Sequence, residues 1–144
     1  MTTQDTIELL QECDAGVKMG ITSIDQVLDK IKSEKLKHVL SDNKTAHETL
    51  ANELQKLLAE AHCDNGQPNM MAKGMSWMKT EFKTAMDERD EAIADLMTDG
   101  CDMGVKSLRK YLNQYESASD EAKDICRRII DVEEDLRNKL KEYL

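Results

Sequence analysis

Four long segments of this chain place apolar side chains three and four residues apart without interruption. Because an α-helix has about 3.6 residues per turn, this spacing collects the side chains on one helix face. In the first segment the face comprises Ile7, Leu10, Asp14, Val17, Ile21, Ile24, Leu28 and Ile31. In the second it comprises Leu36, Leu40, Asn43, His47, Leu50, Leu54, Leu57 and Ala61. Helices of this kind bury their apolar faces only by packing against one another, so the pattern predicts a helical bundle.

The boundaries of the helices follow from capping and turn residues. We expect one domain over residues 1–144, with helices over residues 3–32, 34–61, 70–86, 88–115 and 119–143. Ser33 is the expected break and cap between the first two helices, which a connection this short turns into an antiparallel hairpin. Residues 62–69 are rich in turn formers and form the clearest linker.

An internal repeat supports two related hairpins. Residues 13–18, Cys-Asp-Ala-Gly-Val-Lys, match residues 101–106, Cys-Asp-Met-Gly-Val-Lys, at an offset of 88 (101 minus 13). The helices that follow align at an offset of 86, which pairs Leu50 with Leu136 and Leu54 with Leu140. Two hairpins joined by a crossover with a short extra helix form an all-α, antiparallel four-helix bundle with the connectivity of the ferritin-like class.

Composition and charge exclude several classes of function. The chain has 34% charged and 3% aromatic residues, one proline and a net charge of −9, as expected of an acidic helical protein. An acidic chain repels the phosphate backbone of nucleic acid, and no apolar run is long enough to cross a membrane. The first residues lack the layout of a secretory signal, so we expect a cytoplasmic protein. The four cysteines are too scattered for a disulfide framework or a zinc site, and we expect free thiols.

The order of these features resembles a bacterial family of uncharacterised ferritin-like four-helix proteins. In that family a hairpin ends in a segment like residues 50–55, Leu-Ala-Asn-Glu-Leu-Gln. A turn-rich linker follows, and then a short helix containing tryptophan, as in residues 73–79, Lys-Gly-Met-Ser-Trp-Met-Lys. The resemblance covers nearly the whole chain. It implies the ferritin-like fold and implies no activity.

A di-iron centre is not expected in this chain. Metal-binding ferritin-like proteins place a Glu on each of two helices and Glu-x-x-His on each of the other two. No Glu-x-x-His occurs in the sequence, and Leu136 and Lys139 in the last helix stand at a level where ligands would be needed.

Four polar residues nevertheless remain candidates for a reduced metal or small-ligand site: Asp14, His47, Glu53 and Glu133. The alternative is that Asp14 and Glu133 lie at the edges of the apolar faces, reach water or a lysine, and fix the register between helices. Distance argues against one ion held by Asp14 and His47. The hairpin sets Asp14 at the level of Glu53, roughly 7–8 Å from His47 along the axis at ~1.5 Å per residue.

The segment over residues 70–86 is rich in methionine and contains the only tryptophan. Its apolar residues, Met71, Met75, Trp77, Met78 and Phe82, are candidates for an interface between subunits, since Met and Trp are common at binding surfaces. A soft-metal site of the copper(I) type is the alternative for its methionines.

These observations favour a non-enzymatic ferritin-like bundle that acts through self-association or a protein partner and needs no cofactor. An unconventional or degenerate metal-binding ferritin-like protein is the alternative. Catalysis lacks support, because His38, His47, His62 and the cysteines match no nucleophilic motif and no Gly-rich phosphate loop exists.

We expect light scattering on a sizing column to show a dimer, and Trp77→Ala to shift it toward monomer. Truncating an interface tryptophan typically costs about 2 kcal/mol or more of association free energy. A wild-type chain that is strictly monomeric would contradict this prediction.

Overall fold

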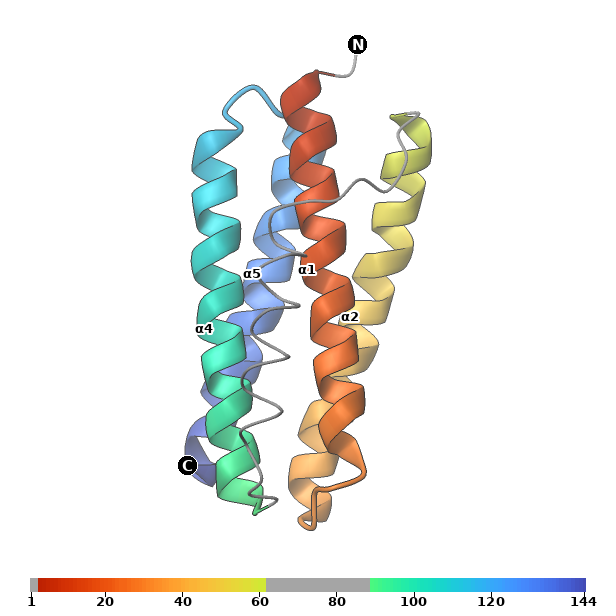
Figure 1. Ribbon diagram of the computed structural model, residues 1–144. Coiled ribbons are helices and arrows are strands. Elements are labelled where there is room, and N and C mark those ends of the chain that lie inside the picture. Colours follow the sequence, from red (N-terminus) through yellow and green to blue (C-terminus); the bar gives the residue numbers. More distant parts are fainter. Residues whose placement is uncertain (1–2, 62–88) are drawn as a thin grey trace.

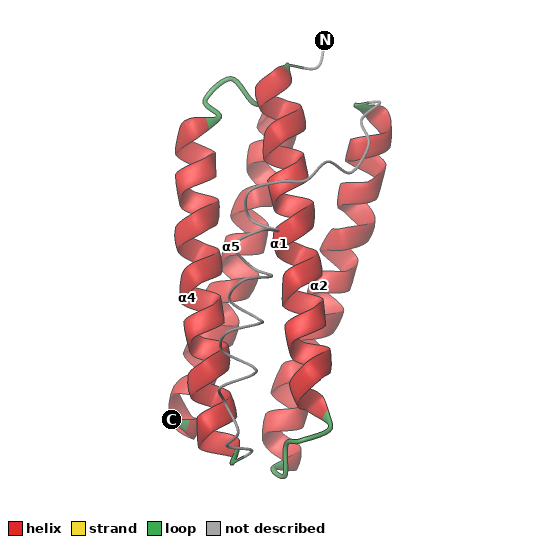
Figure 2. Ribbon diagram, in the orientation of Figure 1, coloured by secondary structure: helices red, strands yellow, loops and turns green. Residues whose placement is uncertain are grey.

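The computed structural model describes residues 3–61 and 89–144, and within these ranges every regular element is helical (Figures 1 and 2). The elements are α1 (Gln4–Leu28), α2 (Glu34–Glu60), α4 (Asp90–Gln114), α5 (Asp120–Leu140) and a short 3₁₀ helix (Lys141–Tyr143). The prediction of an all-helical bundle is therefore confirmed for the described ranges. The helix predicted over residues 70–86 lies outside them.

Side-chain caps begin three of these helices. The hydroxyls of Thr3, Ser33 and Ser119 each accept a hydrogen bond from the backbone N–H three residues later, at Thr6, Leu36 and Ala122. These bonds satisfy amide groups that have no partner inside the helix. Acidic residues also occupy the first turn of each helix, where the positive end of the helix dipole stabilises them.

Ion pairs and hydrogen bonds between helices define the course of the chain. Between α1 and α2, Asp25 pairs with Lys44 at 2.6 Å and Asp14 accepts from Gln55 at 3.0 Å, so residue numbers rise along one helix as they fall along the other. Between α4 and α5 the corresponding ion pairs are Asp102–Arg137 and Arg109–Glu134. Figure 1 shows the two hairpins side by side, with α2 and α4 beginning at the same end of the bundle.

The turn between α1 and α2 begins earlier than the sequence pattern indicates. We expected the first helix to extend to residue 32, but it ends at Leu28, and Ile31 is a turn residue that is 2% exposed. In the sequence Ile31 has the spacing of a helix residue. In the structure its side chain reaches the core from the turn that follows the helix. The carboxylate of Asp90, the first residue of α4, accepts hydrogen bonds from the backbone N–H groups of Lys32 and Ser33 at 2.9 and 2.8 Å. These bonds fasten the turn of the first hairpin to the second hairpin.

The apolar core consists of two clusters, one toward each end of the bundle. The first cluster draws its buried residues from 9–17 of α1, 50–58 of α2, 108–118 at the end of α4, and 122–130 of α5. The second draws on residues 24–40, 93–101, and Leu136 and Leu140. Each helix therefore has a short stretch between the clusters that contributes no fully buried apolar residue: 18–23, 41–49, 102–107 and 131–135. These four stretches define the middle layer of the bundle.

Within the described residues, no helix combines the length and apolar character needed to cross a bilayer.

Candidate functional site

The middle layer contains the most unusual polar contact in the described structure. His47 of α2 and Glu133 of α5 face each other there, and their Nε2 and Oε1 atoms are 2.7 Å apart. His47 is 1% exposed and Glu133 is 8% exposed. A buried ionisable group is costly unless it is paired and hydrogen bonded, so each residue satisfies the other.

The second ring nitrogen of His47 fixes the proton count of this pair. Nδ1 lies 3.0 Å from the backbone oxygen of Asn43, and because a carbonyl oxygen only accepts, Nδ1 carries a hydrogen and donates it. The hydrogen bond between Nε2 and Oε1 then requires one further proton. The pair is either imidazolium with carboxylate or neutral imidazole with carboxylic acid, and its net charge is zero in both forms.

The environment shifts the titration of the groups around this contact. Burial lowers the pKa of His47, but the hydrogen bond and charge of Glu133 and the Asn43 carbonyl together outweigh it, and the pKa is raised above the ordinary 6.5. Burial, followed by the neighbouring Glu133 carboxylate, raises the pKa of the Cys101 thiol far above its ordinary range. Cys101 is therefore a neutral thiol at physiological pH.

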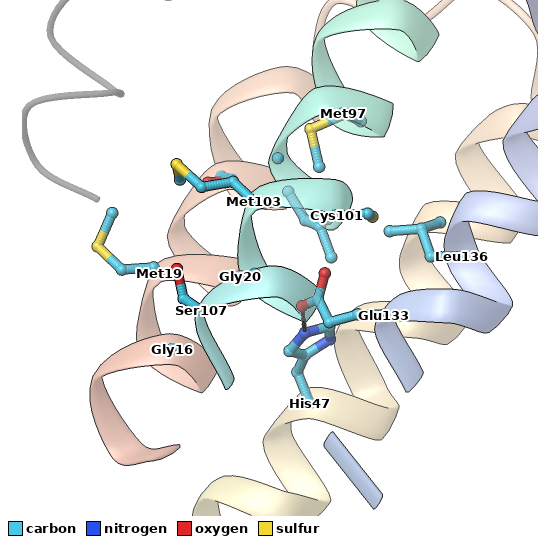
Figure 3. A pocket seen from close by; sticks show the side chains of 14 residues that line it. Gly16, Met19, Gly20, His47, Met97, Cys101, Met103, Ser107, Glu133 and Leu136 are labelled. Carbon is cyan, nitrogen blue, oxygen red and sulfur yellow. Dashed lines mark hydrogen bonds and ion pairs between the residues drawn. The ribbon is translucent and has the colours of Figure 1, made fainter. Parts of the chain in front are cut away.

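A cavity of about 60 Å³ opens beside the pair, between α1 and α4 (Figure 3). Glycines from both helices line it and leave space that side chains fill elsewhere in the core. The described residues that line it are Gly16, Met19, Gly20, Ser23, Ile24, His47, Met97, Gly100, Cys101, Met103, Gly104, Ser107, Glu133 and Leu136.

Two of these glycines differ in what a side chain would meet. A Cβ on Gly20 would lie 2.6 Å from His47 Nε2, a distance that real Cβ contacts do not reach. A Cβ on Gly104 would lie 3.6 Å from Glu133 Oε2, an ordinary van der Waals contact. Gly20 therefore lets α1 approach the imidazole closely, whereas Gly104 leaves room beside the carboxylate.

The structure separates the four candidate ligands predicted from sequence. It brings His47 and Glu133 together. These residues are 86 positions apart in the chain, the same offset that aligns the second helix of each hairpin in the internal repeat. Asp14 instead pairs with Lys18 at 2.7 Å and accepts from Gln55, and Glu53 pairs with Arg128 at 2.7 Å. Asp14 thus contacts a lysine, as expected if its role is to fix the register between helices. It also lies near the level of Glu53, where the hairpin was expected to place it. Among the described residues, no group of three or more His, Cys, Asp or Glu side chains is arranged to hold a metal ion.

Sequence reasoning missed the cavity. Its one available signal was the set of glycines in helix interiors, Gly16, Gly20, Gly100 and Gly104, each of which lowers helix stability by ~1 kcal/mol relative to alanine. The predicted interface residues Met71, Met75, Trp77, Met78 and Phe82 lie outside the described residues. Self-association through them stays a prediction.

Comparisons of the chain with protein-family models, with curated proteins and with solved structures return no significant match.

Alanine substitutions at the two glycines should have opposite effects on stability. We expect Gly104→Ala to stabilise the protein by about 0.5–1 kcal/mol, because alanine favours the helix and the new methyl group fits. We expect Gly20→Ala to destabilise it by about 1–3 kcal/mol, because the methyl group overpacks against a ring held by two hydrogen bonds. Urea unfolding measures both changes, and equal effects at the two positions would contradict the described packing.

The raised pKa of His47 predicts a specific pH dependence. A group whose folded pKa lies above its unfolded value of 6.5 contributes stability that is fully present below about pH 6.5 and is lost as pH rises through the folded pKa. Glu133→Gln removes the charge that raises this pKa. The stability difference between chelator-treated wild type and Glu133→Gln, measured by urea unfolding, should therefore be larger at pH 6 than at pH 9.

His38, whose side chain is 78% exposed, offers the matched control. His38→Gln should change stability at pH 6 by no more than about 0.5 kcal/mol, as is usual for an exposed position. A stability difference for Glu133→Gln that is constant from pH 6 to pH 9 would show that the pair does not titrate as described.

Proposed function

We propose that this protein is a non-enzymatic bundle of the ferritin-like type that binds one small ligand in the cavity beside His47 and Glu133. The observation that carries the proposal is the coincidence of a buried, hydrogen-bonded ion pair with open space in the same layer of the core. Ligand sites are typically concave and mostly apolar with a few convergent polar groups, and this cavity has that composition.

The ferritin-like assignment is supported by the course of the helices. Two hairpins pack side by side with opposite chain directions within each, and the chain must pass from one end of the bundle to the other between α2 and α4. One long crossover of this kind distinguishes ferritin-like bundles from simple up-and-down bundles.

The side chains in the middle layer do not fit the di-iron centre of that class. Such a centre needs carboxylates from all four helices and two histidines. Here α1 and α4 contribute Gly20 and Gly104 opposite the pair, so one carboxylate and one imidazole remain. The function proposed here therefore involves no step through a di-iron cluster.

The described residues of the lining also show none of the features of a catalytic site. The proton of the His47–Glu133 pair is already shared between the two residues, and Cys101, the thiol in the lining, is held neutral by burial. Neither arrangement activates a nucleophile. Binding without turnover is the chemistry that these residues support.

The lining also restricts the ligand. Among the described residues it contains no lysine or arginine, so within this part of the chain an anion would find no positive partner beyond the imidazole that Glu133 already neutralises. A net charge of −9 attracts cations toward the protein. At about 60 Å³ the cavity has room for roughly two water molecules, at ~30 Å³ each, so the ligand has only a few heavy atoms or is a single ion.

A stabilisation screen tests the proposal with five probes: Cu(I), Ag(I), methylammonium, 1-propanol and formate. We expect at least one cationic or neutral probe to raise the melting temperature of the wild type by about 5–10 °C at a hundredfold excess over its Kd, since such binding adds about 2.7 kcal/mol. Formate should have no effect.

Gly104→Val provides the control, because its side chain occupies the space beside Glu133. The same probe should not stabilise this variant, whose helical content is checked by circular dichroism. Gly104→Ala should give an intermediate response. If no probe stabilises the wild type, or if each stabilises wild type and Gly104→Val equally, the cavity is not a binding site.

A further inference from the structure

The methionines of the described residues have an uneven distribution. Of the nine methionines in the chain, Met19, Met97 and Met103 fall within the described ranges, and all of them line the cavity. Cys101 adds a fourth sulfur atom to the same lining. The two long core clusters, by contrast, contain Met97 as their one methionine and are otherwise built mainly from Leu, Ile, Val and Ala.

The positions of these sulfur-containing residues differ in depth. Met97 and Cys101 stand one turn apart on α4 and are 4% and 2% exposed. Met19 and Met103 are half-buried, and Figure 3 shows them on the side of the cavity away from His47 and Glu133. The lining thus has two buried sulfur donors on α4, Met97 and Cys101, and two half-buried thioethers, Met19 and Met103, on α1 and α4.

Donor chemistry separates the possible cations. Thioether and thiol sulfur together with imidazole nitrogen are ligands that Cu(I) prefers, whereas Mg²⁺, Ca²⁺ and Mn²⁺ require several oxygen donors. Among the described residues the lining provides a single carboxylate, Glu133, which is too few oxygen donors for these ions. An organic ammonium ion would use the carboxylate but would leave the sulfur atoms without a role.

We propose that the cavity binds one soft monovalent metal ion of the Cu(I) type, with Met97, Cys101 and His47 as its inner ligands. This inference rests on the proposed function, because it names the ligand class of the same cavity. Met19 and Met103 provide the outer thioethers along which the ion reaches the inner ligands.

Charge balance in the buried layer is compatible with such an ion. Binding forms a bond from Cu(I) to Cys101 Sγ with loss of the thiol proton to solvent, and copper stays in the +1 state. His47 Nε2 donates its lone pair to the ion, and the proton that it shared stays on Glu133. The metal cation and the thiolate then cancel, and the layer remains neutral, as its burial requires.

The competing interpretation is that flexible methionine side chains simply fill irregular space beside the glycines. It predicts sulfur atoms in the cavity without metal affinity. A titration with Cu(I) itself distinguishes the two.

The experiment is an anaerobic titration of the full chain with Cu(I) in competition with bicinchoninate, whose copper complex is coloured. The wild type should bind one equivalent of Cu(I) that bicinchoninate does not remove. Met97→Leu and Cys101→Ala should each weaken binding of that equivalent at least tenfold. Met97→Leu conserves volume and retains the fold, and circular dichroism verifies this for both variants.

The matched control uses a thiol outside the cavity. Cys126 is a buried thiol of the first core cluster that lies against Cys13. Cys126→Ala should retain the equivalent with unchanged affinity. The inference is overturned if wild type withholds no copper, if Met97→Leu and Cys101→Ala bind as tightly as wild type, or if the control variant loses the equivalent instead.

Failure of this inference and failure of the proposed function give different results. Methylammonium or 1-propanol could stabilise wild type but not Gly104→Val, while Cu(I) and Ag(I) stabilise neither protein. In that case the cavity binds a ligand of another class. If no probe acts through the cavity, both proposals fall.

Discussion

The hydrogen bond between His47 and Glu133 is the contact on which the middle of the bundle depends. Two ionisable groups are removed from water there, and they remain together because one shared proton gives the pair no net charge. A displacement of α2 along α5 by one turn, about 5.4 Å, would leave each group buried and unpaired. The pair therefore fixes the register of these two helices more strictly than the apolar contacts on either side, which tolerate exchange among Leu, Ile and Val.

The glycines of α1 and α4 are the counterpart of this pair. Gly20 allows α1 to approach the imidazole within a distance that no side chain permits, and Gly104 leaves space next to the carboxylate. Each glycine weakens its helix, and the long apolar clusters above and below stabilise the bundle despite that loss. The result is a bundle with two apolar clusters and a glycine-lined cavity beside the pair. Binding sites commonly have this design, because stability comes from one part of a core while another part stays open to a ligand.

Much of the fold could be predicted from the sequence, and the errors have physical causes. The spacing of apolar residues identified all the described helices, and the expected cap at Ser33 located the start of α2. The end of α1 was wrong because Ile31 keeps the helical spacing while it packs as a turn residue, and spacing alone does not distinguish the two. The site was predicted only in part. His47 and Glu133 were recognised as polar residues on apolar faces, but their contact joins helices that are 86 residues apart in the chain.

By itself, then, the sequence determined the local properties of this protein: which segments are helical, which face of each is apolar, and which polar residues share that face. These properties depend on neighbours within a turn or two, so periodicity reveals them. The tertiary structure alone decided which buried polar groups meet, and that Asp14 and Glu53 find partners other than His47. It also decided that glycines and methionines far apart in the chain line the same cavity. A cavity is a property of several helices packed together, and no single segment of sequence contains it.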